Sequence, residues 1–235
     1  MSDRILERSA RASGAIAGAL AIAALVVAGK TPGVDASAAE ITDAYVGNRG
    51  RLLAAILIAS ASLVFLLWFI GALASILREA GMGGWAATII AALTARAGLQ
   101  LVIVTVHGAL AYKIAEDGDP GVVQGLRDLT WALGVTASLP IAVVLFASAL
   151  GLSRAGIAPP WYRWAGLIGA AITVLGGTTW ARAGFWAPDG LYALIVIVVA
   201  LSWMFVTSTL LLLAPPSARV VPQRSKETVA YPKVR

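Results

Sequence analysis

The chain has 235 residues, of which 59% are hydrophobic and only 13% are charged. Soluble domains average about 25% charged residues and lack repeated apolar runs of about 20 residues. The composition therefore excludes an ordinary soluble protein and predicts one that crosses a membrane several times. The net charge of +6 does not indicate nucleic-acid binding, because the basic residues lie beside the apolar runs and in the C-terminal segment.

The absence of cysteine excludes disulfides, thiolate catalysis and thiolate-bound metals or clusters. A single histidine excludes haem held by two histidines of one chain. The sequence has no metalloprotease, nucleophile-elbow, P-loop or dinucleotide signature, and its apolar runs hold no pair of carboxylates. We therefore expect no cofactor, no metal site and a non-catalytic role.

Six apolar runs, each about as long as a membrane-spanning helix, follow one another along the chain. They cover residues 10–29, 52–77, 85–112, 129–152, 164–180 and 191–213. We predict an all-α membrane protein, with a bundle of six transmembrane helices within residues 1–214. For the first run the alternative is a cleaved signal peptide, although its cleavage-like segment Ala36-Ser37-Ala38 lies well beyond the end of the run.

The connection between the first and second spans is long enough to hold structure of its own. Thr31-Pro32-Gly33 predicts a turn, and the segment 35–45 places Ala38, Ile41 and Tyr45 on one side of a helix. We expect a short outer helix there, on the membrane surface or capping the bundle.

Two prolines mark the fourth span. Asp119 before Pro120 is the pattern of a helix N-cap followed by a proline in the first turn. Pro140 removes a backbone donor inside the span and predicts a kink near mid-depth.

Small residues recur at every fourth position in two spans, which predicts close helix packing. They are Gly14, Gly18, Gly169, Thr173 and Gly177. The small face of the fifth span is also a candidate docking surface for a membrane-protein partner or for a second copy in a homo-oligomer.

An excess of Lys and Arg predicts the orientation. Six spans place both termini on one side, and that side also carries Arg78, Arg154 and Arg163 at the ends of spans. The positive-inside rule then places the N- and C-termini in the cytoplasm, in a multi-pass protein of the plasma membrane. Residues 215–235, basic and interrupted by proline, predict a disordered cytoplasmic tail.

The third span carries three polar residues in its apolar run, Arg96, Gln100 and His107. At about 100° per residue, Gln100 lies roughly 40° from Arg96, and His107 about 20° from it, so all three share one side of the helix. An arginine deep in a span normally faces a protein interior or a wet cavity. The alternative is interhelical hydrogen bonding or snorkelling to the cytoplasmic surface.

Arginines and tryptophans collect at the span ends that are predicted to face outward. The candidates for binding a ligand there are Arg51, Arg127, Asp128, Trp131 and Arg182. A cavity mouth with these side chains fits an amphipathic or anionic ligand. The alternative is an ordinary aromatic belt with loop salt bridges.

Three segments carry a resemblance to a known group of proteins. Arg8-Ser9-Ala10-Arg11 leads into a Gly-rich first span, Asn48-Arg49-Gly50-Arg51 enters the second, and Leu77-Arg78 ends it. This layout resembles the uncharacterised six- or seven-span integral membrane proteins of actinobacteria. The resemblance implies the same fold and carries over no activity and no site residue.

Three functions remain open from the sequence. The first is a protein with an outward-facing polar cavity ending near Arg96, which binds a lipid or small amphipathic anion. The second is a structural or accessory subunit of a membrane complex. The third is a small transporter or channel.

Overall fold

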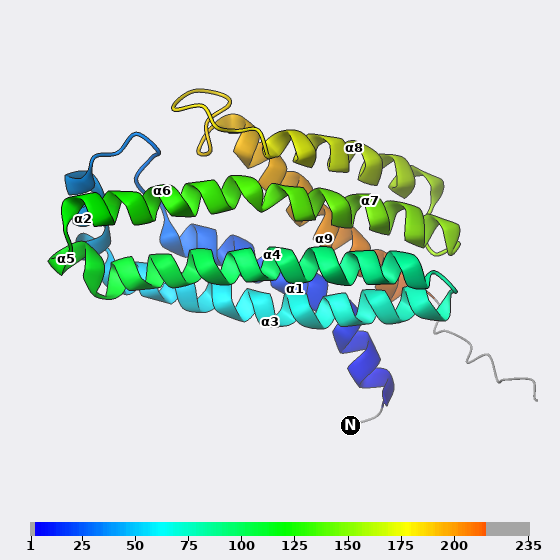
Figure 1. Ribbon diagram of the computed structural model, residues 1–235. Coiled ribbons are helices and arrows are strands. Elements are labelled where there is room, and N and C mark those ends of the chain that lie inside the picture. The colour runs from blue at the N-terminus through cyan, green and yellow to red at the C-terminus, as the bar shows by residue number, and fades with distance from the viewer. Residues whose placement is uncertain (1–2, 215–235) are drawn as a thin grey trace, which may run out of the picture.

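The computed structural model describes residues 3–214, and all its regular elements in that range are helices (Figure 1). They are α1 (Asp3–Ala28), α2 (Ala38–Gly47), α3 (Arg49–Glu79), α4 (Gly83–Ala109), the π-helix η1 (Leu110–Ile114), α5 (Ala115–Asp117), α6 (Pro120–Thr136), α7 (Ser138–Arg154), α8 (Pro160–Gly176) and α9 (Leu191–Leu213). Within the described residues, five helical stretches are long and apolar enough to cross a membrane. The predicted all-helical class is confirmed. The tail 215–235 lies outside the described residues.

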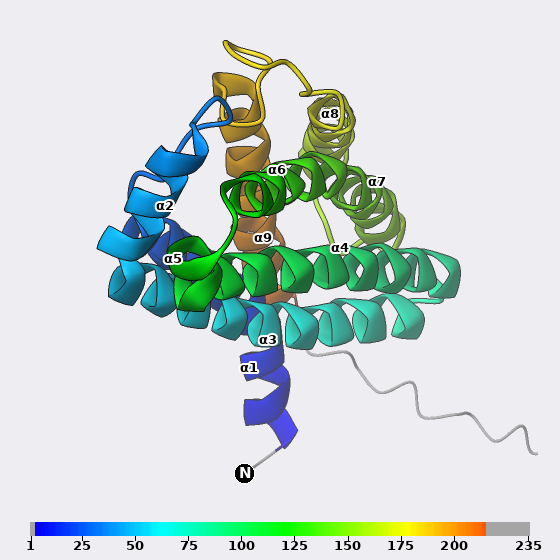
Figure 2. The same cartoon turned by 60° about the vertical axis from the view of Figure 1, so that its left-hand side comes forward.

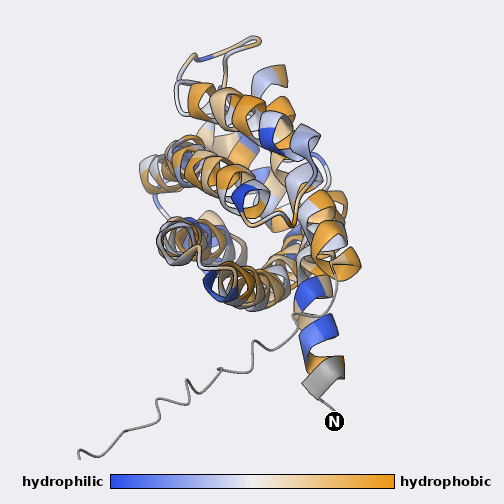
Figure 3. Ribbon diagram, turned by 90° about the vertical axis from the view of Figure 1, so that its right-hand side faces the viewer, coloured by the Kyte–Doolittle hydropathy of each residue, from blue (hydrophilic) through white to orange (hydrophobic). Residues whose placement is uncertain are grey.

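The long helices form a closed ring. Going round it, α1 contacts α3, α3 contacts α4, α4 contacts α6 and α7, α7 contacts α8, α8 contacts α9, and α9 returns to α1. Figure 3 looks along the ring axis, with many apolar residues on the outward faces. We call the end that holds α2 and α5 the cap end, and the end that holds the α3–α4 and α7–α8 turns the turn end (Figures 1 and 2).

The fifth predicted span differs from the structure. We expected residues 164–180, whereas α8 covers Pro160–Gly176 and has only 17 residues. The chain leaves the helix at Gly177 and folds back over residues 177–190, where the Trp186 indole N–H donates to the Thr178 carbonyl at 2.8 Å. Glycines at this point weaken the helix and permit the turn.

The helix of the fourth span begins at the predicted N-cap, and it is interrupted close to the proline that predicted a kink. The Asp119 carboxylate accepts a hydrogen bond from the Gly121 N–H at 2.8 Å, and Pro120 occupies the first turn. The helix is interrupted at Ala137, between α6 and α7. Pro140 has no N–H to offer the Thr136 carbonyl four residues earlier, which explains the break.

The cap end extends beyond what a bilayer needs. The stretch Gly83–Asp117 has 35 residues, which is about 52 Å at 1.5 Å per residue, against about 30 Å of hydrocarbon. Ile41 and Tyr45 of α2 pack there on Leu110, Ala111 and Val123. This second core gives the cap end its own packing.

A larger core fills the turn end of the ring. It includes Phe69, Leu73, Ile89, Leu152 and Leu211, all fully or almost fully buried. Polar side chains inside it are paired, as the Tyr162 and Thr207 hydroxyls are at 2.7 Å and the Trp203 indole N–H and Ser148 hydroxyl are at 2.8 Å. This half of the ring is solid.

Arg11 ties the two ends of the described chain together at the turn end. Its guanidinium donates to the carbonyls of Leu211 at 2.9 Å and Ala214 at 3.1 Å, and it pairs with Glu7. A cation at these C-terminal carbonyls of α9 satisfies acceptors that no helical N–H reaches. The start of α1 and the end of α9 therefore lie side by side.

The small residues of the predicted packing faces lie at close helix contacts. A Cβ added to Gly14 would lie 2.7 Å from Phe69, and one added to Gly177 would lie 2.8 Å from Leu139. Gly169 faces Leu145 of α7 and Val199 of α9, and Thr173 is fully buried. The small face of α8 is therefore used inside the ring.

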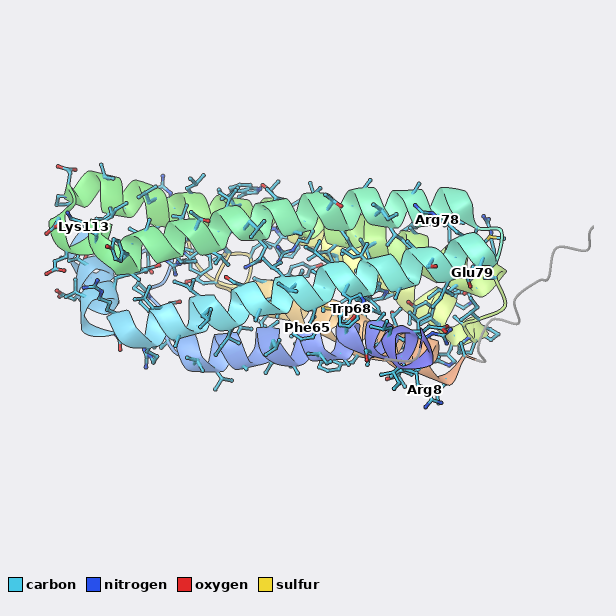
Figure 4. All side chains as sticks on the ribbon, turned by 90° about the horizontal axis from the view of Figure 1, so that it is seen from below. Arg8, Phe65, Trp68, Arg78, Glu79 and Lys113 are labelled. Atoms are coloured by element: carbon cyan, nitrogen blue, oxygen red, sulfur yellow. The ribbon has the colours of Figure 1, made fainter. Side chains whose placement is uncertain are left out.

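Charged residues lie almost entirely at the two ends of the bundle. Figure 4 shows Lys113 at one end, Arg8, Arg78 and Glu79 at the other, and Phe65 and Trp68 on the side of α3 between them. Trp68 is 42% exposed. Arg96 is the one Lys, Arg, Asp or Glu in α4, and it lies at the middle of that helix.

The start of α2 should loosen in acid. Ser37 and Glu40 form a capping box, and hydrogen bonds from the Ser37 N–H and hydroxyl, both at 2.8 Å, hold the pKa of Glu40 below its ordinary value of 4.5. A lowered pKa stabilises the folded state above the unfolded value, and this contribution is lost as the pH falls through the folded value. Amide exchange of α2, corrected for intrinsic rate, should accelerate below about pH 4.5. The Ser37→Ala variant should show fast exchange already at neutral pH, and an unchanged rate would contradict the role of this cap.

Candidate functional site

The cap-end half of the ring surrounds a partly open cavity of about 520 Å³. All the long helices of the ring except α8 contribute several residues to its wall, and α8 contributes Gly176. Most of the wall is aliphatic. At the turn end the cavity stops against Leu93, Val144 and Trp203, which belong to the solid core.

One wall of the cavity is polar. Arg96, Gln100 and His107 all border it, from one side of α4. Arg96 follows the turn-end Trp85 by eleven residues, which is about 16 Å along the helix, or roughly half of the 30 Å thickness of a bilayer's hydrocarbon core. His107 lies about 16 Å further toward the cap end.

Arg96 is the least satisfied of these side chains. Its Nη1 atom is buried and has no hydrogen-bond partner. Among the residues that the structure describes, no Asp or Glu lies within ion-pair distance of it, and none lines the cavity. Burial without an acceptor costs free energy, since a guanidinium stays charged under all ordinary conditions.

His107, in contrast, has a defined partner. The Tyr45 hydroxyl and His107 Nδ1 are 2.5 Å apart, and the two rings are stacked with centroids 6.1 Å apart. Burial raises the pKa of the Tyr45 phenol, and the nearby Arg127 guanidinium partly offsets this rise. A protonated phenol donates to Nδ1 and leaves the imidazole proton on Nε2. His107 is thereby oriented as a neutral side chain.

Arg127 closes the cap end of the cavity. It is only 3% exposed, and its guanidinium lies over the Trp131 ring at 4.4 Å. Its Nη2 donates to the Pro32 carbonyl at 2.8 Å, which fixes the turn after α1. Its Nε and the Trp131 Nε1 are buried and have no acceptor.

The remaining candidates of the outer rim lie outside this cavity. Asp128 and Arg182 are exposed and, with Trp131, line a second hollow of about 550 Å³ at the cap end. Arg51 is exposed and lies against Gly29 at the end of α1. The structure thus places Arg96, Gln100, His107, Arg127 and Trp131 around one cavity. Asp128 and Arg182 line only the second hollow, which Trp131 also borders, and Arg51 lines neither.

Sequence reasoning missed the pairing of Tyr45 with His107. The signal was available in part, since Tyr45 was expected on the same side of the short helix as Ala38 and Ile41, and His107 on the polar side of its span. The short helix packs on residues of the π-turn that follows α4. This turn changes the helix register, and no sequence pattern indicated it.

Removing the Tyr45 hydroxyl should destabilise the cap end. We expect Tyr45→Phe to lower the free energy of unfolding by about 1 kcal/mol, because the half-buried His107 loses the hydrogen-bond partner of its Nδ1. Tyr112→Phe is the matched control, since Tyr112 is 66% exposed and should show no change. Denaturation in mild detergent measures both, and equal effects would contradict the hydrogen bond.

No family model, curated protein or solved structure matches this chain. The resemblance to actinobacterial membrane proteins therefore stays a prediction.

Proposed function

We propose that this chain is a six-span membrane protein that binds an amphipathic anion in its interior cavity, with the anionic group on Arg96. One observation carries the proposal: Arg96, whose buried Nη1 has no acceptor, borders a largely aliphatic cavity that no described carboxylate lines. Such a site offers a charged donor to an anionic group and an apolar surface to the rest of the ligand. A volume of about 520 Å³ lies within the roughly 300–1,000 Å³ of small-ligand pockets.

In this proposal α8 is the sixth span, although it is shorter than the others. Trp161 and Trp164 lie at its turn end, and Trp180 and Trp186 follow its cap end, as expected where a helix meets both membrane interfaces. With six spans both termini lie on one side. The positive-inside rule makes that side cytoplasmic, because the five Lys and Arg of residues 215–235 follow the last span in the sequence and add to the turn-end arginines. The cap end with its short helix α2 then faces outward, in the plasma membrane.

The two other functions lack a comparable observation. An accessory role would use the small face of α8, but α7 and α9 cover Gly169 and Thr173. A transporter or channel needs a path to the other side, whereas the cavity ends on the packed residues Leu93, Val144 and Trp203. Binding is therefore the function that the geometry supports best.

The orientation and the cavity are tested with single cysteines, since the natural chain has none. A membrane-impermeant thiol reagent added from outside should label Lys113→Cys and leave Arg78→Cys unlabelled. Ile103 borders the cavity, so Ile103→Cys reports on the cavity. Leu101 is 53% exposed on the ring surface, so Leu101→Cys is the control position. Sodium dodecanoate should protect Ile103→Cys from a small permeant reagent, and dodecan-1-ol should not. Protection by both, or by neither, would contradict an anion site.

A further inference from the structure

The cavity presents unpartnered donors at two levels. Arg96 Nη1 lies deep, while Arg127 Nε and Trp131 Nε1 lie toward the cap end; none of the three buried atoms has an acceptor, and their residues all line the same cavity. Each of these groups donates hydrogen bonds and accepts none. A ligand that satisfied only Arg96 would leave the two cap-end donors buried and unpaired.

The two levels are separated by apolar wall. Between them the cavity is bordered by Ile56, Ile103, Val196 and Ile197. Arg96 and His107 are about 16 Å apart along α4, and His107 contacts Tyr45, beside Arg127. Trp131 lies one turn deeper than Arg127 on α6, so the separation of the donor levels is roughly 10–16 Å.

Charge complementarity favours an acidic group at both levels. Neither arginine forms an ion pair within residues 5–214. Asp128 and Asp189 lie near Arg127 but not within ion-pair distance, and Asp189 accepts from the Val34 N–H at 3.1 Å. The cavity therefore carries two positive charges and no described negative charge on its wall.

From this we infer that the ligand has two heads: a single-chain amphiphile with an acidic group at each end, one on Arg96 and the other on Arg127 Nε and Trp131 Nε1. The inference rests on the proposed anion site and names the class of its ligand. An extended backbone of three bonds spans about 3.6 Å, so roughly 10–16 Å corresponds to a chain of about 8–13 bonds. A two-chain phospholipid has far more hydrocarbon than a cavity of about 520 Å³ can take in.

The test compares the one-headed tetradecanoic acid with the two-headed tetradecanedioic acid. Their affinities for the full chain in mild detergent are measured by calorimetry at a pH where both acids are ionised. The diacid should bind about tenfold tighter, as expected for one further charge-assisted hydrogen-bonded contact. Along a series of diacids from about 8 to 18 carbons, affinity should pass through a maximum.

Trp131→Phe removes the indole N–H and keeps a ring beneath Arg127. In this variant the ratio of the two affinities should fall toward one, whereas Arg96→Gln should weaken the binding of both acids.

Equal affinities in the natural protein would overturn the second head, and so would an unchanged ratio in Trp131→Phe. The Arg96 site itself would survive either result if tetradecanoic acid still bound and lost its affinity in Arg96→Gln. If neither acid bound the natural protein, both proposals would fall. Should Trp131→Phe not fold, the ratio and the chain-length maximum in the natural protein still decide.

Discussion

Arg96→Gln should stabilise the ligand-free protein and abolish its response to an anionic amphiphile. The guanidinium is buried beside aliphatic walls without an acceptor for Nη1, and a neutral amide is cheaper to bury. We expect the free energy of unfolding to rise by about 1–3 kcal/mol. Affinity for dodecanoate should fall by about 10- to 100-fold, the loss of one or two hydrogen bonds to a charged group. Chemical denaturation and calorimetry measure the two effects separately.

Arg11→Gln is the matched control, because Arg11 is also buried but both of its terminal nitrogens have acceptors. It is 5% exposed, bonds two carbonyls at the end of α9 and pairs with Glu7. Its loss should lower the free energy of unfolding by about 3 kcal/mol and leave dodecanoate affinity unchanged. If Arg96→Gln also destabilised the empty protein, Arg96 would be a structural residue like Arg11.

Gly166→Ala should weaken the contact between α7 and α8. An added Cβ would lie 2.5 Å from the Ala149 Cβ and 3.2 Å from the Leu145 carbonyl oxygen, so the two helices would have to separate. Overpacking of this kind costs about 2–3 kcal/mol. Thermal unfolding in detergent should show the loss directly.

Gly98→Ala is the same substitution at another site, and it should raise the stability of the protein instead of lowering it. Gly98 lies in α4, is exposed, and has nothing within 4 Å of an added Cβ. Alanine should stabilise the helix there by up to about 1 kcal/mol. Equal effects of the two substitutions would show that α8 does not pack on α7 as described.

The helical class was predictable because its signal is local. Long apolar runs, the cap at Asp119 and the proline at 140 each act through their own stretch of chain, and the structure has the corresponding helices and the break at Ala137. The end of α8 was missed by four residues, because Gly177 can continue a helix or end one. Its outcome depends on how residues 177–190 fold back, which is tertiary information.

The candidate site was predictable only along one helix. The helical period places Arg96, Gln100 and His107 on one side, and all three border the cavity. Which residues of other helices meet that side could not be derived from spacing. Arg127 joins the cavity while its neighbour Asp128 faces another hollow, although both were assigned to the same outer rim. Neighbouring residues of a helix point about 100° apart, and this difference decides which of the two hollows each side chain lines.

Native mass spectrometry of the protein purified in mild detergent tests the central claim most directly. The natural chain, titrated with dodecanoate, should carry the anion as a bound adduct at stoichiometry one, and dodecan-1-ol should give none. Arg96→Gln should lose the adduct, and Arg96→Lys should retain part of it. An adduct of equal occupancy in the natural chain and in Arg96→Gln would contradict the account, because the anion would then bind somewhere other than on that guanidinium.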